Sequence, residues 1–292
     1  MASTAHKDPE QLRERQCEPE MLEKQAVQLA TLIAQAKHLV AFTGAGISTS
    51  AGIPDFRGPE GVWTMRAQGK SAQARTPTLK AVPTPTHMAL VALQNSGHLK
   101  FLISQNTDGL HRRSGMDPAK LAELHGNTNL EMCRSCGRDF LRDFSCRRRA
   151  NLVHEHETDR KCSGCGGALY DTIINFGEAL PERALREGFS NARKADVMLV
   201  LGSSLTVTPA CEMPRQTAER GGRLVVCNLQ TTPLDGAAYL RPWVEVDDGL
   251  PAVEAAASSL SSFSRHISRN EFMNMTRIQK FQNGKSGVIF RN

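Results

Sequence analysis

The sequence predicts an α/β fold: one doubly wound parallel sheet with a small inserted domain. Short apolar segments that end in glycine or polar residues alternate with segments whose apolar residues recur at helical spacing. Such alternation is typical of a Rossmann-like sheet with helices on both faces. The alternation is lost where four of the eight cysteines form two Cys-x-x-Cys pairs, so the insert is predicted to bind zinc.

The expected strands are short and strongly apolar. They cover residues 38–46, 99–106, 197–204 and 223–230, with a shorter fifth strand at 243–246. Helices are predicted at 20–37, at 86–97, which begins with Thr86 and ends with Gly97, and at 181–194, which opens with Pro181. The segment 58–86 is too long for a simple connection and is expected to be a functional loop.

The chain of 292 residues has ordinary globular composition, with 40% hydrophobic and 23% charged residues. We expect four parts. They are an N-terminal extension and helix at 1–37, a Rossmann-like domain at 38–130 and 171–250, a zinc-binding insert at 131–170, and a basic tail at 251–292.

Charge is concentrated in that tail. Residues 261–292 carry six Lys or Arg against one acid, and therefore five of the six net positive charges of the chain. A basic tail suits an acidic partner such as nucleic acid or chromatin. The alternative is a solvated, partly disordered chain end.

No apolar run reaches the roughly 18 residues of a membrane span, and the first residues are polar, unlike a signal peptide. We therefore expect a soluble protein inside the cell, without a membrane partner. The remaining cysteines are scattered, which fits a reducing compartment. They are Cys17, Cys146, Cys211 and Cys227.

The paired cysteines are Cys133, Cys136, Cys162 and Cys165. Four thiolates at this spacing bind zinc tetrahedrally and leave no open position, so one structural zinc ion is predicted. The 25 residues between the pairs exceed the usual interval of about 15–20. His154 and His156 are alternatives for one of the cysteines.

Each of the four longer strands is followed by small or polar residues. In an open parallel sheet, ligands bind outside the carboxyl ends of the strands, so a nucleotide is expected across this edge. Gly44 and Gly46 would let backbone N–H groups approach a phosphate. Thr49 replaces the third glycine of the dehydrogenase fingerprint, and no acidic residue lies near 64–66, so hydride transfer is not indicated.

Among the histidines, His125 is the best candidate general base, because an imidazole can accept a proton near neutral pH. His87, His98 and His111 are interpreted as structural.

Several segments together resemble the sirtuins, in that family's order, over roughly residues 38–248. They are residues 44–48 (GAGIS), 52–58 (GIPDFRG), 105–111 (QNTDGLH), 125–126 (HG), 202–205 (GSSL) and 228–230 (NLQ), together with both cysteine pairs. Residues 58–64 (GPEGVWT) and the long interval between the cysteine pairs resemble the class IV branch, the sirtuin-six and sirtuin-seven type, which is largely nuclear.

The resemblance implies that NAD is a co-substrate and assigns its site. Catalytic residues would be His125, Asn106 and Asp108. NAD would contact Gly44, Ala45, Gly46, Thr49, Asp55, Phe56, Arg57, Trp63, Gln105, Asn106, Asp108, His125, Gly202, Ser203, Ser204, Asn228, Gln230 and Val246.

The implied reaction transfers an acyl group from lysine to ADP-ribose and releases nicotinamide. The resemblance implies an acyl-lysine protein substrate, with histone tails and a nuclear location expected, and contact with nucleosomes or DNA through basic segments.

Two rival functions remain open. The cysteine pairs, residues 147–149 and the basic tail would suit a zinc-ribbon protein that binds nucleic acid or chromatin, although an aromatic content of 5% is low for base stacking. An NAD-dependent protein mono-ADP-ribosyltransferase would use the same pocket as the deacylase.

Overall fold

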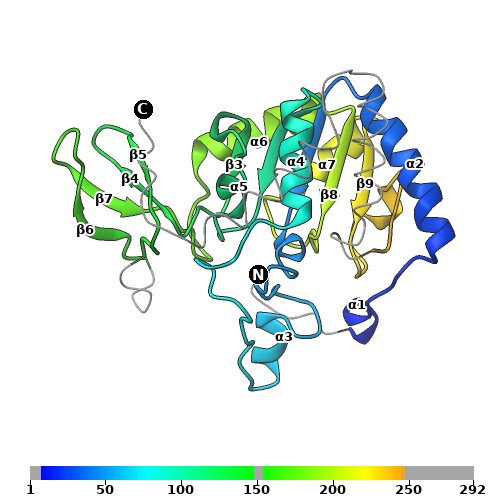
Figure 1. The fold of residues 1–292 in the computed structure, drawn as a ribbon, viewed down its shortest axis with the longest axis horizontal. Helices are drawn as coiled ribbons and strands as arrows, with labels where there is room; N and C mark the ends of the chain where they lie inside the picture. Colours follow the sequence, from blue (N-terminus) through cyan, green and yellow to red (C-terminus); the bar gives the residue numbers. More distant parts are fainter. Residues whose placement is uncertain (1–7, 148–153, 245, 247–292) are drawn as a thin grey trace, which may run out of the picture.

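A five-stranded, fully parallel sheet forms the centre of the protein in the computed structural model, which describes residues 8–147, 154–244 and 246 (Figure 1). The strand order is β3-β2-β1-β8-β9. The strands are β1 (Leu39–Thr43), β2 (Leu99–Ser104), β3 (Leu121–Glu123), β8 (Val197–Leu201) and β9 (Arg223–Cys227). The predicted α/β fold with a parallel sheet is confirmed.

The side on which strands are added to the sheet reverses at β1. From β1 the chain adds β2 and β3 on one side, and later adds β8 and β9 on the other. Such a switch leaves a crevice at the carboxyl ends of the two strands that flank it. Here the two flanking strands are β1 and β8.

Both faces of the sheet are buried, as expected for parallel strands. Leu39 and Ala41 of β1 pack on the side of α2 (Pro19–Gln35) and α4 (Pro85–Asn95). Val40 and Phe42 pack on the side of α6 (Glu182–Lys194) and α7 (Glu212–Glu219). The strand is therefore buried at every position and apolar at all but the last, Thr43.

The three predicted helices correspond to α2, α4 and α6, each within a few residues. Two begin with proline, which is tolerated in the first helical turn, and α4 has a capping box between Thr84 and His87. Apart from α7, the other helical segments are short, and η denotes a 3₁₀ helix. They are α1 (Pro9–Leu12), α3 (Val62–Ala67), α5 (Leu110–Arg113), η1 (Ala45–Ile47), η2 (Pro118–Lys120) and η3 (Asp235–Ala237).

A second, antiparallel sheet lies beside the first, at the left of Figure 1. Its order is β5-β4-β7-β6, from β4 (Leu130–Cys133), β5 (Asp139–Leu141), β6 (Glu157–Lys161) and β7 (Ala168–Asp171). We call it the zinc sheet because it carries both cysteine pairs. Its buried apolar cluster contains only Cys133, Cys162 and Leu169 among the described residues, with Phe140 against it.

The fifth strand of the parallel sheet differs from the prediction. The described residues within 243–246 form no strand, and near this segment only Leu240 makes an isolated bridge, to Val225. The fifth position is taken by β3, on the opposite edge. β3 was not predicted because three residues are too few to show a strand periodicity.

The helix α7 was also not predicted. Pro214 is its third residue, and proline ordinarily interrupts a helix. It is tolerated here because the first-turn N–H groups have no partner within the helix.

Among the described residues, no helix has both the length and the apolar character needed to cross a membrane. The predicted basic tail, 251–292, lies outside the described residues.

We expect Phe42→Ala to lower the free energy of unfolding by ~3–5 kcal/mol, because it leaves a cavity at a fully buried position of β1. Chemical denaturation measures the change. Leu79→Ala, at a side chain that is 43% exposed, is the control and should change it by less than ~0.5 kcal/mol. A similar loss in both variants would contradict the placement of Phe42 in the core.

Candidate active site

A cavity of about 890 Å³ lies at the carboxyl edge of the parallel sheet. Loops after all five strands of that sheet line it, together with residues near α3 and a segment between β7 and α6. The sequence-predicted residues in its lining are Gly44, Ala45, Gly46, Asp55, Phe56, Arg57, Trp63, Gln105, Asn106, His125, Gly202, Ser203, Ser204, Asn228 and Gln230.

The loops after β1 and β8 are in direct backbone contact. A Cβ atom on Gly44 would lie 2.6 Å from the carbonyl oxygen of Gly202. A Cβ atom on Gly46 would lie 2.8 Å from the Cα atom of Gly202. The N–H of Gly44 donates to Leu201 (3.0 Å) and that of Gly46 to Gly202 (2.9 Å). These two N–H groups join the loops, and glycine is required at both positions for the close approach.

Side chains after β2 complete this junction. The amide of Asn106 donates to the carbonyl of Gly44 (3.0 Å), and the hydroxyl of Ser203 donates to the side-chain oxygen of Gln105 (2.7 Å). Three strand ends are therefore held together by hydrogen bonds at the floor of the cavity.

His125 follows β3, and its ring nitrogen Nδ1 lies 2.9 Å from the carbonyl oxygen of Gln105. Because a carbonyl can only accept, Nδ1 carries the proton in the neutral ring and Nε2 has the lone pair. Burial lowers the pKa of His125 and outweighs the opposing effect of the hydrogen bond to Gln105. A neutral imidazole able to accept a proton thus lines the cavity at neutral pH.

The turn after His125 is fixed by close packing. Gly126 has a φ of 79°, and a Cβ atom there would lie 1.8 Å from the carbonyl oxygen of Thr172. Glu123 accepts hydrogen bonds from Arg112 Nε (2.7 Å) and Asn127 Nδ2 (2.6 Å). The residues on both sides of His125 are therefore held in place.

Residues far apart in sequence also meet beside the loop after β9. Asn228 donates to the carbonyl of Gln230 (2.9 Å), and the amide of Gln230 lies 3.2 Å from the carbonyl oxygens of Leu12 and Arg57. The carboxylate of Asp55 accepts from the N–H of Gly58 (2.9 Å), and burial raises its pKa.

Aromatic rings from two segments contact one another at the cavity. Phe56 stacks with Trp63 at 5.8 Å between ring centroids, and Trp63 meets Phe176 edge-on at 6.0 Å. Phe56 and Phe176 are among the exposed large apolar side chains. These rings join the segment near α3 to the segment between β7 and α6.

Three sequence-predicted residues do not line the cavity. Thr49 bonds to the carbonyl of Gly46 (3.0 Å). Asp108 is buried and accepts from the Ser48 hydroxyl and the Leu110 N–H, both at 2.8 Å, while burial raises its pKa. Val246 packs in the core on the α2 and α4 side of the sheet.

The histidines interpreted as structural include two that are deeply buried. Burial lowers the pKa of His87 to about 3 and that of His111 well below its usual value. Their rings lie 4.7 Å apart. Neither histidine lines the cavity.

The sequence reasoning missed one wall of the cavity, the residues 174–180. Their signal is weak: apolar Ile173, Ile174 and Phe176 stand beside Gly177 in a stretch too short for a helix. Other lining residues that were not predicted are Thr107, Arg147, Leu185, Val207, Thr208 and Pro209.

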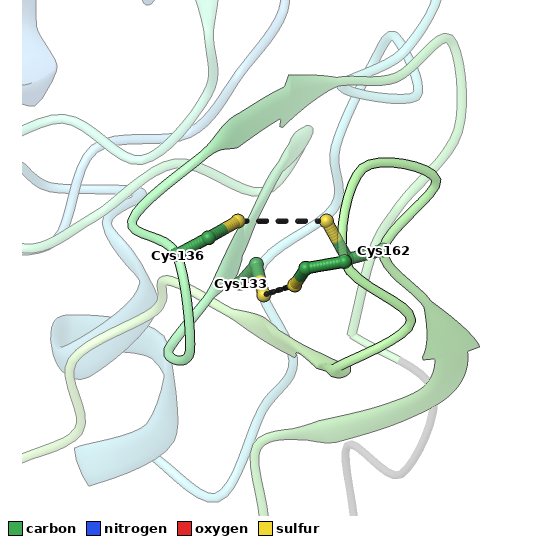
Figure 2. Close-up of side chains that lie close together, drawn as sticks. Cys133, Cys136 and Cys162 are labelled. Atoms are coloured by element: carbon green, nitrogen blue, oxygen red, sulfur yellow. Dashed lines mark hydrogen bonds between the residues drawn. The ribbon is translucent and has the colours of Figure 1, made fainter.

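The four paired cysteines converge in the zinc sheet, with their sulfur atoms all within 4.8 Å of one another. Cys133 and Cys165 are 3.5 Å apart and Cys136 and Cys162 are 3.7 Å apart, measured between Sγ atoms (Figure 2). Sulfur atoms bound to one tetrahedral zinc at ~2.3 Å would lie ~3.8 Å apart. The four thiols therefore fit a structural zinc ion.

His154 and His156 are not part of this cluster. His154 bonds to Glu178, and His156 bonds to Asp171 and Glu178. The alternative in which one of these histidines replaces a cysteine is therefore wrong.

The cavity also fits a dinucleotide. Its volume falls within the range of about 300–1,000 Å³ for ligand pockets, and polar side chains converge on it from several strand ends. The aromatic rings of Phe56, Trp63 and Phe176 provide apolar surface at the same cavity.

Comparison with known proteins gives consistent matches. The model of the Sir2 family matches residues 69–209. The NAD-dependent protein deacetylase SRT1 of Oryza sativa subsp. indica is 50% identical over 76% of this chain and 46% of its own length. The NAD-dependent protein deacetylase Sirt6 of Drosophila melanogaster is 41% identical over 76% of this chain and 71% of its own length.

A solved structure described as "Sir2-p53 peptide-NAD+" is 33% identical, with a TM-score of 0.60, and the match covers 80% of this chain and 98% of that one. The chain spans about half the length of its plant relatives, 46% of each.

We expect Cys133→Ala to lose bound zinc, because three thiolates and a methyl group cannot complete the tetrahedral site. Elemental analysis should find no metal, and limited proteolysis should cut within 130–171, since the small apolar cluster there cannot replace the metal. Cys146→Ala, at a buried cysteine outside the cluster, is the matched control and should retain one zinc. One equivalent of zinc in Cys133→Ala would refute the assignment.

Proposed function

Because the chain belongs to the Sir2 family, we propose that it is an NAD-dependent protein lysine deacylase of the class IV type. The observation that carries this proposal is the hydrogen bond between His125 Nδ1 and the Gln105 carbonyl, which leaves Nε2 as a proton acceptor at the cavity. The curated relatives described as NAD-dependent protein deacetylases support it.

When bound, NAD supplies the ADP-ribosyl group that accepts the acyl group, with release of nicotinamide. Ala45, Gly46 and Ser204 would hold its pyrophosphate, and Asn228 and Gln230 its adenine ribose. All five residues line the cavity.

The nicotinamide end belongs beside Gln105 and Asn106, whose side chains are already fixed by Ser203 and Gly44. Asp108 does not line the cavity; its carboxylate accepts a hydrogen bond from Ser48, and it would act through this buried contact. Preformed positions of this kind reduce the entropy cost of aligning the reacting groups.

His125 would be the general base, with Nε2 as its proton-accepting atom. Its Nε2 would take a proton from a ribose hydroxyl and so activate that oxygen toward the acyl group. The rings of Phe56 and Trp63 would exclude water from the same space, which limits hydrolysis of the co-substrate.

The substrate proposed is an acyl-lysine side chain of a protein, and histone tails are the expected targets in the nucleus. Solved relatives support an acyl-lysine protein substrate, since one is described with a p53 peptide and another as bound to a propionylated peptide. Similarity to Sirt6 and sirtuin-7 relatives supports the choice of class.

Mass spectrometry of acetyl-lysine and myristoyl-lysine histone peptides tests the activity directly. We expect loss of the acyl group only when NAD is present, with formation of O-acyl-ADP-ribose. ADP-ribose attached to protein without deacylation would favour the mono-ADP-ribosyltransferase instead. NAD that stays intact even with nucleosomes added would contradict both enzymatic functions.

We expect kcat/KM for deacylation to fall as the pH drops through the pKa of His125, because only the neutral ring accepts a proton. Burial places this pKa below its usual value, ~6.5, so titration of His125 itself should impose no pH dependence at pH 7 and above. His125→Tyr should lower the rate by about 10²–10⁴-fold or more, with zinc content unchanged. Wild-type rates in this variant would show that His125 is not the base.

A further inference from the structure

The wall of the cavity formed by residues 174–180 is connected to the zinc sheet by a group of four titratable side chains. Glu178 lines the cavity, and its Oε1 lies 3.0 Å from His156 Nε2 and 2.5 Å from His154 Nδ1. The other ring nitrogen of His156 lies 3.1 Å from Asp171 Oδ1. Asp171 ends β7, so one imidazole joins the zinc sheet to the wall of the cavity.

Glu178 also shapes its own segment. Its carboxylate accepts from the backbone N–H of Asn175 (2.7 Å) and from the Asn175 side chain (3.1 Å). One carboxylate therefore closes a turn in the wall and at the same time contacts His156.

The beginning of the same segment is bonded to the proposed base. The N–H of Ile174 donates to the carbonyl oxygen of His125 (3.1 Å). The segment is thus held at Ile174 by His125, the proposed general base, and at Glu178 by His156. Figure 1 shows this chain path, from β7 in the zinc sheet to α6 beside the parallel sheet.

The residues assigned to NAD lie in the loops after the strands and near α3, which leaves the wall 174–180 for the acyl-lysine peptide. We infer that His156 is a positioning residue for this side of the active site: through Glu178 it holds the wall in the shape that binds substrate. This inference rests on the proposed deacylase function. His156 itself does not line the cavity, so its effect would be exerted through Glu178.

Electrostatics favour a protonated His156 between the carboxylates of Glu178 and Asp171, an arrangement that we call the clamp. The side chain of Asp171 is 2% exposed and that of His156 13%, so these charges are only partly screened. Burial alone would raise the pKa of Glu178, but hydrogen bonds from Asn175, His156 and His154 lower it to about 2. Burial alone would lower the pKa of His156, but hydrogen bonds with Glu178 and Asp171 raise it above its usual value.

The pH dependence follows from this direction. The pKa of His156 is raised above its value in the unfolded chain, ~6.5. The charged contacts of His156 with Glu178 and Asp171 are therefore fully present below pH ~6.5, and they are lost as the pH rises through the raised pKa. The groups that face His156 are Asp171 from β7 and Glu178 from the wall, with His154 on its own segment contacting the same Glu178 oxygen. Glu178, with a pKa of about 2, stays charged throughout this window.

The test compares wild type with His156→Gln, which removes the charge and keeps one hydrogen-bonding group. At pH 6.5 the KM for an acetyl-lysine peptide should rise about tenfold, the effect of losing a charge-assisted hydrogen bond, while the KM for NAD stays within about twofold. The wild-type KM for peptide should rise with pH toward the variant's value, and the variant's own KM should not depend on pH.

His98→Gln, at a histidine remote from this group, is the control and should leave both KM values unchanged. Zinc content of each variant excludes a general loss of the zinc sheet. Glu178→Gln and the double variant complete a mutant cycle, in which the double variant should be no worse than the more impaired single one. Additive effects would overturn the inference, because His156 would then act through another contact.

Hydrogen exchange of residues 172–180 gives a readout that does not need activity. Protection of the Ile174 and Asn175 amides should fall in His156→Gln and, in the wild type, with rising pH, after correction for intrinsic exchange. Unchanged protection would overturn the clamp. Lower protection with an unchanged peptide KM would overturn its role in substrate binding. If the wild type does not deacylate at all, the proposed function fails, and the exchange data alone decide the clamp.

Discussion

The parallel pairing of β1 with both β2 and β8 is the constraint on which the rest of the structure depends. Since parallel strands end at the same edge, this pairing brings the loops after Thr43, Ser104 and Leu201 together. The helices on both faces close the sheet, and this edge is left as the place where polar groups can meet a ligand. Asn106 and Ser203 then fix the loops to one another.

The sequence was informative where the signal is local and strong. Four apolar strands, three helices and the four cysteines were identified correctly, because each has a period or spacing that other structures seldom imitate. The edge strand β3 has only three residues, and the wall 174–180 has no periodicity. Their positions depend on contacts with segments distant in sequence, such as Thr172 against Gly126. Such packing cannot be obtained from local patterns.

Two histidines of the zinc sheet illustrate why sequence spacing alone does not identify metal ligands. His154 and His156 lie between two cysteine pairs, and spacing alone makes them candidate ligands. In the structure their rings turn to Glu178 and Asp171 instead, because uncompensated carboxylates that are mostly buried would be costly. The four cysteines of the zinc sheet therefore fit a metal ion, while His156 contacts the wall of the cavity, and the two contacts use different side chains.

The backbone contact of Gly44 and Gly46 with Gly202 has a consequence for recognising related proteins. The contact excludes any side chain at these positions, whatever reaction the molecule performs. A descendant that had lost catalysis but kept its architecture would still need all three glycines. The glycine pattern is therefore a marker of ancestry and shape, whereas a histidine at the position of His125, with its ring bonded to a strand-end carbonyl, would mark the activity proposed here.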